Sequence, residues 1–91
     1  MTREEIEQTE WAKEFKWDAP ISYEQGIDYA LKPNLEVYLN NNSDLGYWVW
    51  AIIVDDDKGF WMDAKETKDE AKELCNKMGW KITFIGEERN G

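Results

Sequence analysis

Histidine is absent from this chain of 91 residues, cysteine occurs once and proline twice. Without histidine, the common zinc sites and the Ser-His and Cys-His nucleophile pairs are excluded. A single cysteine excludes an internal disulfide. Basic residues are also few: 11 lysines and arginines stand against 20 aspartates and glutamates, a formal net charge of −9. This negative charge argues against direct binding to nucleic-acid phosphates or to an anionic membrane.

Long apolar runs are lacking as well. The longest is residues 47–54, far short of the ~20 residues of a membrane span. Residues 1–10 carry four glutamates and no apolar run, which is unlike a signal peptide. We therefore expect a protein of the reducing cytoplasm with no membrane partner.

The length suits one domain, residues 1–91, with a small hydrophobic core. Residues 1–33 are expected to form N-terminal helices. Residues 34–85 are expected to form a sheet with a helix over 68–78, and residues 86–91 a flexible tail.

Three segments have the form of a capping box, a hydroxyl residue followed three positions later by Glu or Gln. They begin at Thr2, Ser22 and Thr67. They predict helices over about 3–15, 23–31 and 68–78. Gly26 should weaken the second helix by about 1 kcal/mol relative to alanine. The third has a regular apolar stripe that includes Cys75, which predicts a buried thiol.

Alternation of apolar and polar residues predicts strands at about 35–40, 47–54, 60–62 and 80–85. The asparagine-rich segment 40–44 is predicted to be a turn. Segment 47–54 is apolar on both faces, so it should be a central strand covered on both sides. The order is helix, helix, three strands, helix, strand. It predicts an α+β fold, a two-layer domain with an antiparallel sheet of three to four strands.

A dense group of carboxylates surrounds the third strand. Its members are Asp55, Asp56, Asp57, Asp63 and Glu66. The EF-hand template fails here, because its sixth position, which needs glycine, is Phe60. No metal and no cofactor is therefore expected. The chain also has no glycine-rich phosphate loop, and we predict that it is not an enzyme.

Six tryptophans are unusual for this length. Trp48 and Trp50 should share one face of the sheet, and Trp61 or Trp80 can join them from neighbouring strands. One interpretation is that the N-terminal helices cover this face. The other is an exposed aromatic patch at Trp48, Trp50 and Trp61, which would mark a protein-binding site.

Acidic residues are concentrated in the N-terminal segment and in the turn before the third strand. The candidate partner-binding residues are Glu7, Glu10, Glu14, Asp55, Asp56, Asp57, Asp63 and Glu66. Carboxylates along one face can imitate the phosphates of a duplex, so the predicted partner is a basic nucleic-acid-binding enzyme. The simpler interpretation is that the charge only keeps a small aromatic-rich domain soluble.

Three short motifs carry a resemblance that covers about half of the chain: Tyr47-Trp48-Val49-Trp50, Gly59-Phe60-Trp61 and Thr67-Lys68-Asp69-Glu70-Ala71. They resemble the ββα modules of small uncharacterised bacterial and phage proteins. A similar succession of a strand, a T-x-x-E-A segment and a helix occurs in the hybrid-binding domain of eukaryotic ribonuclease H enzymes. The basic residues of that domain have no counterpart here. In size, charge and aromatic content the chain is similar to small acidic phage-encoded inhibitors of the anti-restriction or anti-CRISPR type.

The resemblance to phage-encoded inhibitors implies an inhibitor that acts in the cytoplasm of a bacterial host by occupying a basic site. The alternative is an interaction or assembly module that uses a tryptophan-rich sheet face, as a monomer or a homodimer.

Overall fold

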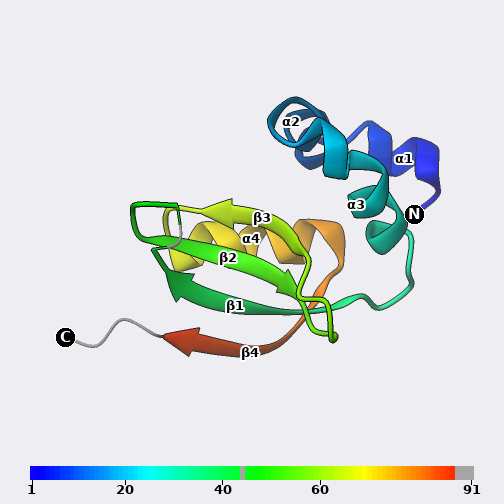
Figure 1. Cartoon of the computed structure of the whole chain (residues 1–91). Helices are drawn as coiled ribbons and strands as arrows, with labels where there is room; N and C mark the ends of the chain where they lie inside the picture. Colours follow the sequence, from blue (N-terminus) through cyan, green and yellow to red (C-terminus); the bar gives the residue numbers. More distant parts are fainter. Residues whose placement is uncertain (44, 88–91) are drawn as a thin grey trace. The chain divides into compact units, whose positions relative to one another are not determined.

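A computed structural model describes residues 1–43 and 45–87 of the chain, which form four α-helices, one short 3₁₀ helix and a four-stranded sheet (Figure 1). The predicted α+β class is confirmed. The chain divides into two compact units, Met1–Pro33 and Asn34–Gly91. Of the predicted tail, Gly86 and Glu87 belong to the last strand, and residues 88–91 lie outside the described residues.

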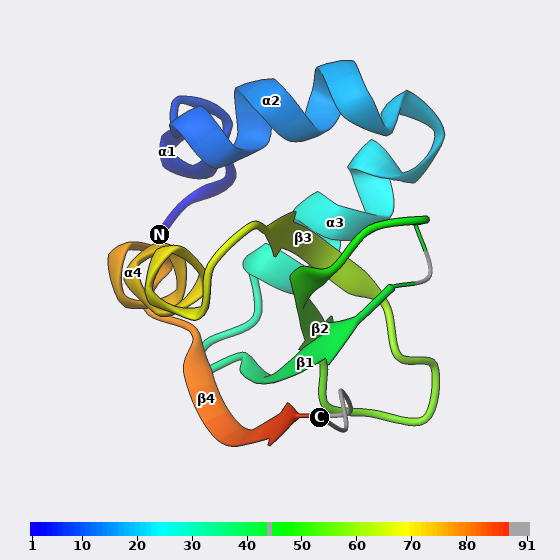
Figure 2. The same ribbon diagram turned by 90° about the vertical axis from the view of Figure 1, so that its left-hand side faces the viewer.

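The N-terminal unit contains α1 (Arg3–Glu7), α2 (Glu10–Asp18), the 3₁₀ helix η1 (Pro20–Ser22) and α3 (Tyr23–Ala30), which Figure 2 shows from a second side. The single helix predicted over 3–15 is wrong. Thr9 interrupts it, because its hydroxyl accepts the Ala12 N–H at 3.1 Å and caps a new helix. The Thr2 capping box is present as predicted, whereas the Ser22 side chain makes no capping hydrogen bond.

Gly26 of α3 lies against the ring of Phe15 on α2. A Cβ atom at this position would collide with the ring of Phe15, whose Cζ would lie only 3.1 Å away. Phe15 in turn stacks on Trp11, with 5.2 Å between the ring centroids. The glycine predicted to weaken the helix therefore has a packing role.

We expect Gly26→Ala to destabilise the chain, although alanine is the better helix former by about 1 kcal/mol. Overpacking a tight contact costs about 1–3 kcal/mol, so after subtracting this gain the free energy of unfolding should fall by up to about 2 kcal/mol. Urea unfolding followed by fluorescence measures it. The control is the double variant with Phe15→Leu, which should recover most of the loss; a Gly26→Ala chain more stable than wild type would contradict the packing role.

The second unit contains β1 (Glu36–Asn42), β2 (Val49–Val54), β3 (Trp61–Lys65), α4 (Lys68–Met78) and β4 (Lys81–Glu87). The strand order is β3-β2-β1-β4. The prediction of an antiparallel sheet is wrong in one respect, since β4 runs parallel to β1. Two hairpins make β3 run in the same direction as β1, and α4 then returns the chain so that β4 repeats that direction.

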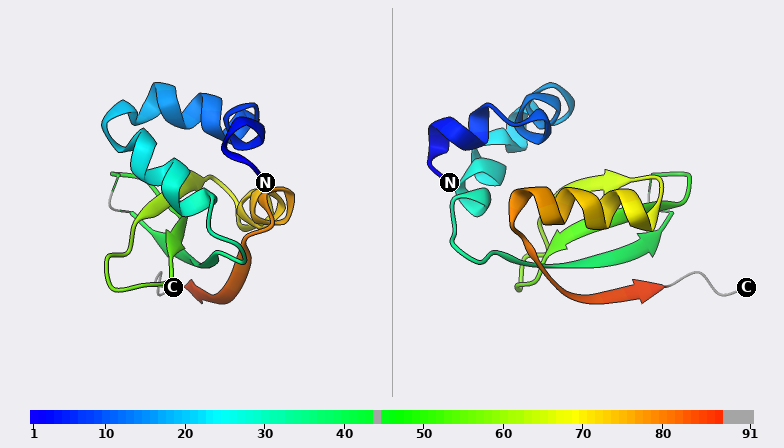
Figure 3. Two further views of the ribbon diagram at one scale, coloured as in Figure 1. Left: turned by 90° about the vertical axis from the view of Figure 1, so that its right-hand side faces the viewer. Right: turned by 180° about the vertical axis from the view of Figure 1, so that it is seen from behind.

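Helix α4 begins and ends where the sequence predicted. The Thr67 hydroxyl accepts the Glu70 N–H at 3.1 Å, and Gly79 ends the helix at a left-handed φ of 74°. The helix lies on one face of the sheet and contacts β2, β3 and β4 (Figure 3). Cys75 is buried, as its place on the apolar stripe predicted.

The central strand β2 ends where predicted but begins at Val49, two residues later than expected, and the end of β1 was predicted wrongly. Residues Asn40 to Asn42 continue the strand instead of turning. Asn41 is buried because its Nδ2 donates to the Val49 carbonyl at 3.1 Å, and Asn42 Nδ2 donates to Asn40 Oδ1 at 2.8 Å. These bonds satisfy the polar side chains within the sheet.

Candidate functional site

The turn between β2 and β3 holds the three consecutive aspartates in a defined geometry. Asp56 Oδ1 accepts the N–H groups of Lys58 at 2.9 Å and Gly59 at 3.0 Å, so this carboxylate closes the turn. Asp55 Oδ2 accepts the hydroxyl of Thr83, on β4, at 2.9 Å. Two of the three predicted carboxylates therefore have structural partners.

Glu36, at the start of β1, joins this group because its carbonyl accepts the Asp55 N–H at 3.0 Å. We call Glu36, Asp55, Asp56 and Asp57 the acidic end of the sheet. Glu36 and Asp57 are exposed, and Lys81 Nζ lies 3.9 Å from the Glu36 carboxylate. Hydrogen bonds therefore hold the backbone of the turn that carries the exposed Asp57.

The other two predicted carboxylates of this group lie elsewhere. Asp63 is a half-buried residue of β3 that pairs with Lys65, 3.6 Å between the charged atoms. Glu66 follows β3 at the end of the strand away from the turn. A strand of five residues spans roughly 16 Å, so the acidic end of the sheet and Glu66 are separate charges on the surface.

Glu7, Glu10 and Glu14 belong to the N-terminal unit. Glu7 pairs with Arg3, whose guanidinium also binds Glu24 at 2.7 Å; hydrogen bonds to Glu24 and Glu7 raise the pKa of Arg3. Glu10 and Glu14 are exposed and lie one turn apart on α2, so they form a separate acidic pair.

The tryptophans predicted to form one patch are divided between the sheet faces. Trp50 lies opposite Lys65 in the register, whereas Trp61 lies opposite Ile53, three positions along β2 from Trp50. Since alternate residues of a strand face opposite sides, Trp50 and Trp61 lie on different faces. Trp50 is half-buried, with Lys68 Nζ 5.6 Å from its ring centroid, and Trp48 is 44% exposed.

The structure exposes apolar residues that the sequence interpretation did not select. Tyr38 on β1 and Phe84 on β4 stack with 4.6 Å between the ring centroids, and Phe84 is half exposed. Further large exposed side chains are Trp17, Ile21, Leu45, Tyr47 and Ile85. Trp17 could have been found from sequence, because it lies off the helical face that carries Trp11 and Phe15.

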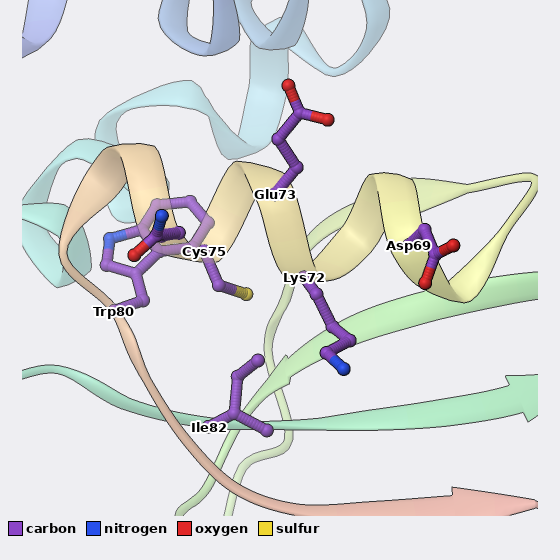
Figure 4. A pocket seen from close by; sticks show the side chains of 7 residues that line it. Asp69, Lys72, Glu73, Cys75, Trp80 and Ile82 are labelled. Atoms are coloured by element: carbon purple, nitrogen blue, oxygen red, sulfur yellow. The ribbon is translucent and has the colours of Figure 1, made fainter.

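A shallow groove of about 590 Å³ lies between α4 and β4 (Figure 4). Buried Cys75 and Trp80 line it together with half-buried Ile82. Its polar lining residues are Asp69, Lys72, Glu73 and Asn76. Burial raises the pKa of the Cys75 thiol to about 12, so this cysteine is a protonated core residue at neutral pH.

Within residues 1–43 and 45–87, no three side chains of the metal-binding types converge on a common point. In the same described ranges, none of the helices combines the length and apolar character that crossing a bilayer requires. The candidate binding surfaces are the acidic end of the sheet, the exposed aromatic residues and the groove beside β4. Compared with protein-family models, curated proteins and solved structures, the chain gives no match.

Proposed function

We propose that this chain is a small acidic protein-binding module. In its more specific form, the proposal is a phage-type inhibitor that imitates nucleic acid and occupies a basic site on a nucleic-acid-processing enzyme. The observation that supports it is the acidic end of the sheet, where hydrogen bonds from Lys58, Gly59 and Thr83 hold the backbone that presents Asp57 and Glu36. A turn whose backbone is already held can present carboxylates to a basic surface with a smaller loss of conformational freedom.

The charge of both units supports the same proposal. Residues 1–33 contain eight acidic and four basic residues, a net charge of −4. Residues 34–91 contain twelve acidic and seven basic residues, a net charge of −5. A partner with a basic channel would therefore be attracted to either unit. Such attraction accelerates association and weakens as salt screens it.

Asp57→Lys is the sharpest test, because within the described residues Asp57 makes no hydrogen bond or ion pair and the turn is closed by Asp56. The immobilised protein is incubated with bacterial lysate at low and high salt, and captured proteins are challenged with a 30-base-pair duplex. We expect capture that is reversed by duplex or salt, and an affinity about tenfold lower for Asp57→Lys.

Asp28→Lys is the matched control, because it makes the same charge change at an exposed position of α3. It should reduce capture less than twofold. Equal losses in the two variants would indicate an effect of net charge alone. If neither the duplex nor high salt reduces the amount of captured protein, the proposal of a nucleic-acid mimic is contradicted.

Exposed Trp48, beside Tyr47 and Leu45, supports a second candidate, an interaction module that works through aromatic contacts. In the same capture assay, Trp48→Ser would then lose a salt-insensitive partner. Trp17→Ser, at a position 86% exposed on α2, is the matched control and should retain it. A salt-insensitive partner retained by Trp48→Ser would contradict this candidate.

A further inference from the structure

β4 forms one edge of the sheet, and among the described strands it pairs only with β1. The Lys81 N–H donates to the Leu35 carbonyl at 2.8 Å, so the backbone polar groups of Lys81 point toward β1. Backbone groups alternate in direction along a strand, and those of Ile82 therefore point outward. An outward row of N–H and C=O groups is a template for pairing with another chain.

The two edges of the sheet differ in their protection against such pairing. The β3 edge carries the Asp63–Lys65 ion pair. The charged residues of β4, Lys81 and Glu87, stand only at the two ends of the strand, and its Phe84 and Ile85 are 51% and 40% exposed. β4 is therefore the edge that accepts an added strand more readily.

The groove between α4 and β4 lies directly beside this edge. Ile82 lines the groove with its side chain, as Figure 4 shows together with Lys72 and Cys75. A strand added alongside Ile82 would place alternate side chains on the same face as Ile82, next to the groove. Backbone hydrogen bonds would then supply affinity and the groove would select side chains.

Charge identifies the occupant. The acidic end of the sheet lies at the start of β4, where Thr83 binds Asp55 and Lys81 lies near Glu36. A second copy of the chain also has a net charge of −9 and would be repelled, whereas a basic segment would be attracted to this edge. We propose that an extended partner segment of alternating apolar and basic residues adds as a strand to β4, with an apolar side chain in the groove. This proposal rests on the proposed function in requiring a basic partner.

The probe is a fluorescein-labelled octapeptide of alternating valine and arginine, tested with the full chain by fluorescence anisotropy. Two analogues are N-methylated either at all valines or at all arginines. Each analogue blocks one edge of the peptide and keeps its charge. We expect one analogue to bind at least tenfold more weakly and the other to bind like the parent. The exchange rate of the Ile82 amide hydrogen should fall at least tenfold when the peptide saturates the protein.

Other outcomes would overturn strand addition. If both analogues bind like the parent and the Ile82 amide is unchanged, the attraction is electrostatic only, and the proposed function stands without this mode of binding. Absence of peptide binding would also overturn it, while the Asp57→Lys capture assay would still decide the proposed function. Protection of Ile82 that rises with protein concentration without peptide would assign the edge to a second copy instead.

Discussion

Replacing Ile52 with alanine is expected to remove a large part of the stability of the fold. Ile52 is fully buried on the central strand β2, between Leu39 of β1 and Asp63 of β3 in the register. Substitutions of this kind cost about 2–5 kcal/mol, because they lose apolar burial and leave a cavity. A chain of this length has a total stability of about 5–14 kcal/mol. Urea unfolding followed by tryptophan fluorescence should therefore show a markedly lower midpoint.

Ile21→Ala provides the matched control for this substitution. Ile21 is 99% exposed in η1, so the same change of side chain removes almost no buried surface. Its effect should stay within about 0.5 kcal/mol. Equal losses in the two variants would contradict the assignment of β2 to the core.

Cys75 is expected to be almost unreactive in the folded protein. Burial raises its pKa from 9.0 to about 12, which lowers the thiolate fraction at pH 8 about a thousandfold. Because the chain has a single cysteine, the rate of iodoacetamide labelling reports this thiol alone. We expect labelling at pH 8 to be about a thousandfold slower in the native protein than in urea.

The same pKa has a consequence for stability. The unfolded thiol ionises near pH 9 and the folded thiol near pH 12, so folding favours the protonated form. The stabilising contribution is complete below pH 9 and is lost as the pH rises toward 12. Native labelling as fast as in urea would contradict the buried position of Cys75 on α4.

Local signals in the sequence predicted α4 well, because both of its ends are determined by nearby residues, the Thr67 cap and Gly79. They failed where a tertiary or competing contact decides. Thr9 starts a second helix inside a continuous helical pattern, and asparagines typical of turns continue β1 once Asn41 bonds to Val49. The parallel pairing of β4 has no local signal, since it depends on the path of the chain through α4.

The candidate surface was predictable only in part. Composition indicated the acidic turn, but it could not show that Asp56 closes the turn while Asp57 remains exposed. Alternation suggested shared faces for the tryptophans, but the register shift between β2 and β3 places Trp61 opposite Ile53. The half-exposed Phe84 was missed because apolar residues in a strand pattern are expected to be buried.

The pairing of β4 with β1 affects the order in which the sheet assembles. Each hairpin joins strands separated by a short connection, whereas the partners Glu36 and Lys81 are about half the chain apart in sequence. Closing such a long loop costs more entropy, so we expect β4 to join the sheet late in folding and to detach first when the sheet opens locally. A partner strand bound to the outer edge of β4 would oppose this detachment. Recognition at the edge and completion of the sheet would then be thermodynamically linked.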